Sequence, residues 1–237
     1  MENNPPKNNY TIAISIVVAA IVVGGAIVWA VGNKSNTTPQ ATSSQTSSSV
    51  SQITPQDVIL GNKNAPVTVI EYGDYQCPYC AEFFNNIEPA LKVYVQSGKI
   101  NMIFREMSFI GSESQMAAEA SYCAADQGKF WEYHDLVYQT KYDDYFKNGG
   151  KENDGSLSNN ALIGLADQLK LDHNQFVQCL SSQKYVAAVS SDNQAAQTLG
   201  VNSTPTVFIN GQEMPAGVGS VSDYQKAIDN ALSAAGK

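Results

Sequence analysis

Two cysteines, Cys77 and Cys80, stand three positions apart in the segment DYQCPYC, residues 74 to 80. Thiols at this spacing can supply half of a zinc site, close a short structural disulfide or exchange electrons with another dithiol. Zinc usually takes four ligands, and the two other cysteines of the chain, Cys123 and Cys179, lie far from this pair and from each other in sequence. A structural disulfide across two residues would restrict the unfolded chain very little. The pattern therefore favours redox exchange.

The flanking residues predict that Cys77 lies where a strand passes into a helix. The run PVTVIEY, residues 66 to 72, is typical of a buried strand. After the cysteines, apolar residues recur at helical spacing: Phe84, Ile87, Leu91 and Val95. The first turn of a helix carries unpaired N–H groups and a partial positive charge, and proline is well tolerated there, as Pro78 would be. We expect these groups to lower the pKa of Cys77, and Cys80 to point inward, one turn further on.

The remaining pattern predicts an α/β protein whose β-containing part is divided in two. A second strand is expected at residues 100–106 (INMIFRE), which completes a parallel β–α–β unit. Residues 112–199 have helical spacing and no strand signal. A third strand (TVFI, residues 206–209), an Asn210-Gly211 hairpin turn and a helix beginning near Ser220 follow. A helical block inside such a domain should be an insertion that packs against it.

The N-terminal part predicts a membrane anchor and a tether. A short tail, residues 1–10, precedes the uncharged segment 11–31, which as a helix would span about 31 Å, close to the thickness of a bilayer core. A cleaved signal peptide is the alternative, although its apolar core is usually shorter. Residues 32–56 are rich in Ser and Thr and predict a disordered linker, which leaves residues 57–237 as the folded domain.

Charge and histidine content narrow the function further. The net charge of −8 argues against binding to nucleic acid. The two histidines, His134 and His173, are not near a cysteine in sequence, so we expect neither to be a ligand or base. Phe130 and Trp131 are expected in the core of the insertion. The tyrosine-rich segment 142–146 could be a binding patch or an ordinary exposed loop.

Four segments together resemble the DsbA-like branch of the thioredoxin superfamily: VIEYGDYQCPYC, CAADQGKFWEYHDLVY, FVQCL and GVNSTPTVFINGQ. The resemblance covers about residues 57–235 and implies a thioredoxin fold with an inserted all-helical domain. It further implies that Cys77 is the exposed nucleophile and Cys80 the resolving thiol. Pro205 would be a cis-proline facing the disulfide, and Thr204 would offer its backbone to an extended substrate.

The resemblance also assigns Glu71 and the second cysteine pair. Glu71 matches the family's buried acid, which could relay protons to Cys80; a strand-end glutamate with satisfied hydrogen bonds is the alternative. Cys123 and Cys179 would form a structural disulfide within the insertion.

The function implied by the resemblance is oxidation of cysteine pairs in exported proteins, outside the cytoplasmic membrane. A quinone-linked membrane partner of the DsbB or VKOR type would reoxidise the protein, and no cofactor or metal is expected beyond the redox-active disulfide. Three alternatives stay open: a disulfide reductase or isomerase with the same site, an envelope binding module in which the CxxC is only structural, and a metal carrier.

Overall fold

The computed structural model describes residues 52–237. The predicted tail (1–10), anchor (11–31) and most of the predicted linker (32–51) therefore lie outside the described residues. Within residues 52–237, no helix combines the length and apolar character needed to cross a membrane. The end of the predicted linker is held against the domain, since the backbone oxygen of Gln52 accepts a hydrogen bond from Arg105 at 2.7 Å.

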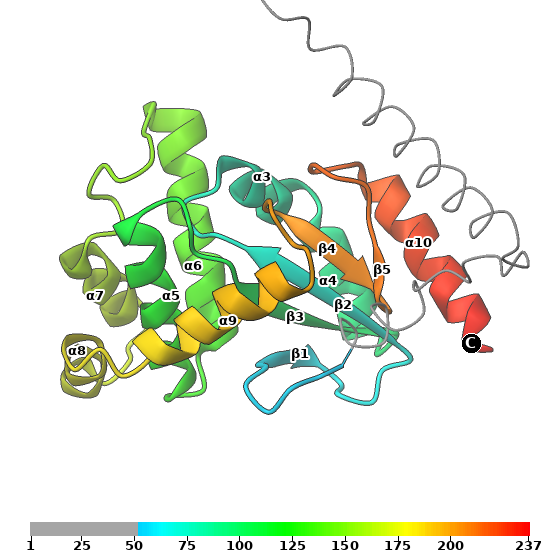
Figure 1. Ribbon diagram of the computed structural model, residues 1–237, viewed down its shortest axis with the longest axis horizontal. Coiled ribbons are helices and arrows are strands. Elements are labelled where there is room, and N and C mark those ends of the chain that lie inside the picture. Colours follow the sequence, from blue (N-terminus) through cyan, green and yellow to red (C-terminus); the bar gives the residue numbers. More distant parts are fainter. Residues whose placement is uncertain (1–51) are drawn as a thin grey trace, which may run out of the picture. The chain divides into compact units, whose positions relative to one another are not determined.

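A mixed sheet forms the centre of the described domain (Figure 1). Its strands are β1 (Ile59–Gly61), β2 (Val67–Gly73), β3 (Ile100–Glu106), β4 (Thr206–Ile209) and β5 (Gln212–Glu213). The order across the sheet is β1-β3-β2-β4-β5. Strands β2 and β3 run parallel, as the β–α–β pattern predicts, and the other neighbours are antiparallel. Sequence reasoning missed β1, because three residues are too few to show a period.

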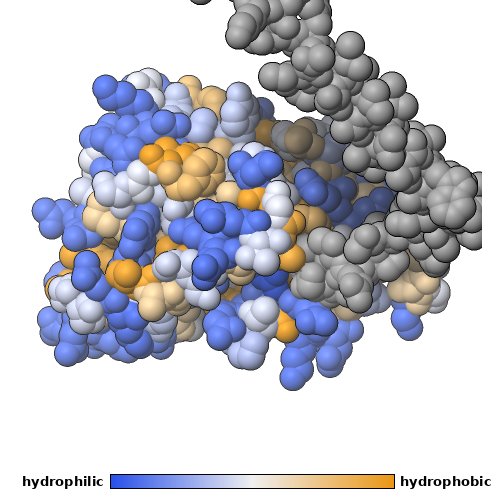
Figure 2. All heavy atoms as spheres, viewed as in Figure 1, coloured by the Kyte–Doolittle hydropathy of each residue, from blue (hydrophilic) through white to orange (hydrophobic). Residues whose placement is uncertain are grey.

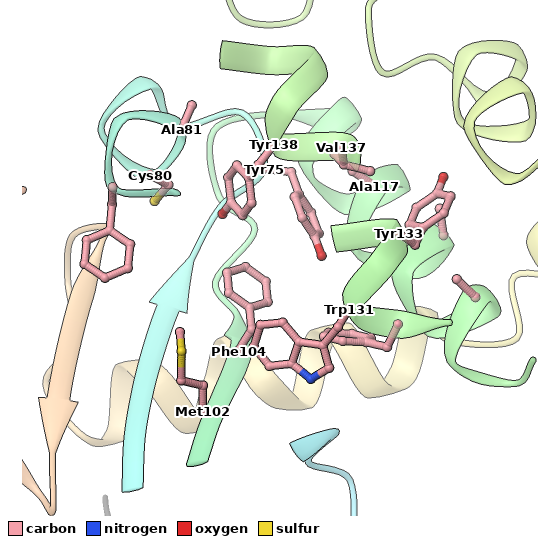
Figure 3. Packing of buried hydrophobic residues seen from close by; sticks show 14 of the residues in the cluster. Tyr75, Cys80, Ala81, Met102, Phe104, Ala117, Trp131, Tyr133, Val137 and Tyr138 are labelled. Atoms are coloured by element: carbon pink, nitrogen blue, oxygen red, sulfur yellow. The ribbon is translucent and has the colours of Figure 1, made fainter. Parts of the chain in front are cut away.

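Alternation along β2 separates two apolar layers. Val67 and Val69 face the larger core, whereas Ile70 and Tyr72 face a smaller one on the other side of the sheet. Glu71 alternates with Ile70 and Tyr72, so it faces the larger core. Figure 3 shows part of that core, where Phe104 of β3 lies between the sheet and the aromatic rings of the helical layer.

Two helices, not one, follow the cysteines. Helix α3 (Pro78–Asn86) ends at Ile87, and α4 (Glu88–Gln96) begins directly after it. The expectation of one continuous helical run is therefore wrong. Pro89 explains the break, because its ring would clash with the carbonyl four residues earlier and it has no N–H to donate. In the first turn of a new helix that missing donor costs nothing.

The helical insertion coincides with the predicted region 112–199. It comprises α5 (Ser112–Ala125), α6 (Phe130–Asp143), the π-helix η1 (Asp144–Asn148), α7 (Asn159–Gln168), α8 (His173–Ser181) and α9 (Val186–Thr198). Helix α9 returns to the smaller core through Ala196. Residues of α5 to α8 share the larger core with the sheet, so the insertion packs against the domain as expected.

The C-terminal hairpin and helix follow the local signals in the sequence. Asn210 and Gly211 join β4 to β5 with φ of 49° and 80°, the left-handed values that an Asn-Gly turn favours. Helix α10 (Val221–Ala234) is capped by Ser220, whose hydroxyl accepts a hydrogen bond from the backbone of Asp223. On the face seen in Figure 2, hydrophilic residues predominate and apolar residues gather in small groups.

Candidate active site

Cys77 occupies the N-cap of α3, directly before Pro78. Its backbone N–H donates to the carbonyl of Asp74 at 2.9 Å, and its thiol donates to the carbonyl of Thr204 at 3.3 Å. The Thr204–Pro205 peptide bond is cis. The loop before β4 therefore meets the CxxC across a sequence separation of 127 residues. This proximity is the arrangement that the family resemblance implies for Thr204 and Pro205.

Cys77 is less accessible than expected. The resemblance implies an exposed nucleophile, but only 5% of Cys77 is exposed to solvent. That expectation is wrong for the structure as it stands, because the thiol is turned toward the carbonyl of Thr204, beside Cys80. A partner must approach the sulfur along the small part that remains open.

Hydrogen bonds to the sulfur lower the pKa of Cys77 from its ordinary value of 9.0 to about 7. The largest contribution is a hydrogen bond from the thiol of Cys80; Thr204 and the backbone N–H groups of Cys80 and Tyr79 add to it, while burial opposes it. The Thr204 hydroxyl is buried and makes no hydrogen bond among the described residues, so it can donate to the sulfur when Cys77 is ionised. The amides at the start of the helix thus act in the predicted direction, although the neighbouring thiol contributes more.

Cys80 has the opposite character. It is fully buried, and desolvation raises its pKa well above the ordinary value. The hydrogen bond to Cys77 and the charges of Cys77 and Glu71 act in the same direction. Figure 3 shows Cys80 on α3 above the sheet, on the side where Tyr75 and Tyr138 pack. One thiol is therefore tuned toward the anion and the other toward the protonated form.

Glu71 is a buried acid of β2 on the same side of the sheet. It is 4% exposed, and its Oε1 has no hydrogen-bond partner among residues 52–237. Burial raises its pKa well above the usual range, and the charges of Glu88 and Cys77 raise it further, whereas Lys92 lowers it. This oxygen is therefore not satisfied as it would be in an ordinary strand-end glutamate, and the side chain can hold a proton.

Asp74 anchors the segment before the cysteines. Sequence reasoning missed this role of Asp74. Its carboxylate is fully buried and accepts hydrogen bonds from the backbone of Gln76 at 2.8 Å, Phe109 at 2.9 Å and Ile110 at 3.1 Å. It therefore fixes the CxxC loop to the loop after β3. The signal in the sequence was an acidic residue at a strand end, which is common in turns and not specific.

Gln76 attaches the same segment to the insertion. Its side-chain amide donates to Ser114 at 3.0 Å and to Asn153 at 3.1 Å. Its backbone carbonyl accepts a hydrogen bond from the hydroxyl of Tyr145 at 2.6 Å. The tyrosine-rich segment 142–146 therefore does contact the residues beside Cys77. Within it, Phe146 remains 51% exposed.

The other singled-out residues lie away from the cysteines or in the core. Phe130 and Trp131 are buried in the insertion as expected, and His134 is fully buried among aromatic rings of α3, β3 and α6. His173 is exposed at the start of α8. Cys123 and Cys179 form a disulfide that joins α5 to α8.

Comparisons with known proteins agree with this geometry. The sequence model of the thioredoxin family matches residues 53–230. A probable disulfide bond formation protein D of Bacillus cereus is 33% identical over 178 residues, which cover 73% of this chain and 77% of that protein. The crystal structure of Wolbachia pipientis alpha-DsbA1 superposes with a TM-score of 0.69 at 25% identity, covering 80% of this chain and 97% of the other.

A further relative differs in length. The Na⁺/H⁺ antiporter NhaA 1 of Salinispora arenicola is 34% identical over 160 residues, which are 66% of this chain but only 22% of that protein. The chain thus spans about a fifth of the length of this relative.

Proposed function

Because this chain belongs to the thioredoxin family, in its DsbA-like branch of thiol:disulfide oxidoreductases, we propose that it exchanges disulfides with protein substrates through Cys77 and Cys80. The observation that carries the proposal is the opposite tuning of the two thiols. The pKa of Cys77 falls to about 7, while that of Cys80 rises well above its ordinary value. A nucleophile and a resolving thiol need this difference.

The reaction begins with the Cys77–Cys80 disulfide. A substrate thiolate attacks the sulfur of Cys77, the bond to Cys80 breaks, and Cys80 leaves as a thiolate that takes a proton from Glu71. The substrate's second thiolate then attacks the mixed disulfide and displaces Cys77 as a thiolate. The substrate has lost two electrons and gained a disulfide, and the two cysteines of the protein hold those electrons.

We propose that the reaction runs mainly in this oxidising direction. Hydrogen bonds that favour the Cys77 thiolate stabilise the reduced form, which makes the disulfide a stronger oxidant. A reductase or isomerase would use the same residues. Equilibration with glutathione buffers separates them, because a potential near about −120 mV indicates a disulfide donor and one near about −270 mV a reductase.

A protein substrate is supported by apolar side chains near the cysteines. Among the described residues, four large apolar side chains are more than half exposed: Val93 of α4, and Tyr79, Phe109 and Phe146. Tyr79 stands between the two cysteines, Phe109 belongs to the loop held by Asp74, and Phe146 is next to Tyr145, whose hydroxyl donates to the backbone carbonyl of Gln76. Exposed apolar side chains beside a reactive sulfur suit an unfolded or extended polypeptide.

The cellular setting belongs to the same proposal. Substrates would be exported proteins with cysteine pairs, and the domain would lie outside the cytoplasmic membrane, held by an anchor at residues 11–31. A quinone-linked membrane protein of the DsbB or VKOR type would remove the electrons from Cys77 and Cys80.

Oxidative refolding of a reduced, unfolded protein tests the function. The purified full chain, oxidised beforehand, should form disulfides in the substrate, and Cys77→Ser should abolish this because the Cys77–Cys80 disulfide cannot form without Cys77. Given a substrate that already contains a disulfide, Cys80→Ser should instead accumulate a mixed disulfide, because Cys77 attacks that disulfide, one substrate thiolate leaves, and no second thiol of the protein resolves the bond; mass spectrometry detects it. The double variant Cys123→Ala/Cys179→Ala is the matched control and should retain exchange. The same low rate of disulfide formation with the unaltered chain and with Cys77→Ser would favour the binding-module alternative.

A further inference from the structure

A second group of ionisable side chains lies below the active-site helix. Glu88, in the first turn of α4, is 1% exposed, and its Oε1 lies 3.0 Å from the ammonium of Lys92. Lys92 also lies 2.6 Å from Oδ2 of Asp135 on α6. The Nδ1 atom of His134 lies 3.1 Å from Oδ1 of Asp135. We call Glu88, Lys92, His134 and Asp135 the Glu88 cluster.

Aromatic rings connect the Glu88 cluster to the elements that carry Cys80 and Glu71. Phe84, one helical turn after Cys80, has its ring centroid 5.6 Å from the Lys92 ammonium and 6.3 Å from the ring of His134. Phe104, which pairs with Glu71 across the sheet, has its ring 4.7 Å from that of His134. The cluster therefore lies between α3, β3 and α6, on the side of the sheet that Glu71 faces.

The cluster carries its own cation. Ligand atoms of Glu88, His134 and Asp135 lie within 4.8 Å of one another, a spacing that could suit a metal ion. The Lys92 ammonium, however, is within salt-bridge distance of both carboxylates. This one ammonium neutralises one of the two carboxylate charges and stands beside both carboxylates, where a metal ion would have to bind.

Unsatisfied polar atoms extend from Glu71 through this cluster. Oε1 of Glu71, Oε2 of Glu88 and Nε2 of His134 are buried and have no hydrogen-bond partner among residues 52–237. A buried polar atom without a hydrogen bond costs free energy, and these three belong to groups that can bind or release a proton. At the other end, the side chains of Lys92 and Asp135 are 26% and 40% exposed. The ionisable groups thus lead from the buried site to solvent.

We propose that the Glu88 cluster sets the proton affinity of Glu71 and exchanges its proton with solvent. The inference rests on the proposed function. When the disulfide opens, Cys80 leaves as a thiolate and takes the proton of Glu71. Glu71 is then a buried carboxylate and regains one proton from solvent through the cluster. No electrons move in this step, and reoxidation reverses the direction of the proton.

The signs of the charges make the proposal specific. The charges that act on Glu71 are Glu88 and Cys77, which raise its pKa, and Lys92, which lowers it. Three further titratable groups face Glu71 and stay unchanged in the variants below: Cys80 of α3, Tyr138 of α6 and Tyr224 of α10. Glu88 in turn faces His134, Lys92 and Asp135. Removing the Glu88 charge should therefore lower the pKa of Glu71, and removing the Lys92 charge should raise it. A cluster too remote from Glu71 to act on it would leave the pKa of Glu71 unchanged in both variants.

The test is the pH profile of disulfide opening. The oxidised full chain is reacted with dithiothreitol between pH 5 and 9, quenched with an alkylating agent, and the rate is divided by the dithiothreitol thiolate concentration. This rate should fall as pH rises through the pKa of Glu71. We expect the midpoint to move down by about one unit in Glu88→Gln and up by about one unit in Lys92→Met. Glu71→Gln should remove the midpoint.

Glu106→Gln is the matched control. Glu106 is also a buried acid with a raised pKa, on β3, but it is not among the groups that shift the pKa of Glu71. The midpoint of the pH profile in Glu106→Gln should equal that of the unaltered protein. Equal midpoints in Glu88→Gln and Lys92→Met, or shifts in one direction, would overturn the proposal. If one of these two variants fails to fold, the direction of the midpoint shift in the other variant decides whether the proposal holds. If the unaltered chain does not react with dithiothreitol faster than Cys77→Ser, the proposed function itself has failed.

Discussion

At the scale of residues, the chemistry depends on two identical side chains made different by a few atoms. Cys77 stands at a helix N-cap, where N–H groups, Thr204 and the thiol of its neighbour face its sulfur. Cys80 lies one turn deeper, fully buried and near the charge of Glu71. The Cys80 thiol donates to the Cys77 sulfur, so the same hydrogen bond lowers one pKa and raises the other.

The lowered pKa of Cys77 predicts a pH-dependent stability of the reduced protein. Because the folded pKa is about 7 and the ordinary value is 9.0, the unfolded chain binds more protons between these pH values. The contribution is fully present above pH 9 and is lost as pH falls through 7. Two units correspond to about 2–3 kcal/mol. Urea unfolding of the reduced protein at pH 7 and pH 9 should show this gain relative to Cys77→Ser. An equal pH dependence in both proteins would contradict it.

At the scale of elements, the break between α3 and α4 and the bridge between α5 and α8 shape the molecule around the site. The break at Ile87 places Glu88 in the first turn of a new helix, where an acidic side chain favours the positive end of the dipole. The Cys123–Cys179 disulfide closes a separation of 56 residues inside the insertion and does not include the redox cysteines.

The bridge predicts a measurable loss of stability when it is removed. Closing a loop of this length restricts the unfolded chain, so Cys123→Ala/Cys179→Ala should lower the free energy of unfolding by about 2–4 kcal/mol. Chemical denaturation of the oxidised protein measures this difference, and the m-value should be compared in both proteins because the unfolded state changes too. A loss confined to the Cys77–Cys80 exchange rate, with unchanged stability, would assign the bridge a redox role instead.

At the scale of the whole described domain, the sheet and the insertion behave as one body. Trp131 of α6 donates to the carbonyl of Val58 at 3.0 Å, before β1. Lys92 and Asp135 join α4 to α6, and Gln76 joins the CxxC segment to Asn153. The larger core is shared by both parts.

Shared packing predicts one cooperative transition for residues 52–237. Leu162 of α7 is fully buried in the insertion, and Leu162→Ala should destabilise the domain by about 2–5 kcal/mol. Calorimetry should show a single peak that moves as a whole to lower temperature, with agreeing calorimetric and van 't Hoff enthalpies. A separate peak that alone responds to this change would show that the insertion unfolds independently.

Local patterns in the sequence determined much of this protein. β-branched runs, helical spacing and the Asn-Gly turn predict β2, β3, β4 and the C-terminal hairpin, since these features depend on neighbouring residues. The position of the CxxC before a proline likewise predicts Cys77 at a helix start. The thioredoxin fold and the roles implied for Thr204 and Pro205 came from the family resemblance.

The tertiary structure alone decided how accessible and how charged the site is. Cys77 is nearly inaccessible to solvent because Thr204, 127 residues away in sequence, contacts its sulfur. In the same way, the contact between Lys92 and Asp135 joins residues that are 43 positions apart. The hydrogen-bonding partners of Asp74 and Gln76 could not be predicted from the sequence either. Burial, hydrogen bonding and charge proximity set these pKa values, and all three arise between segments that a local pattern cannot bring together.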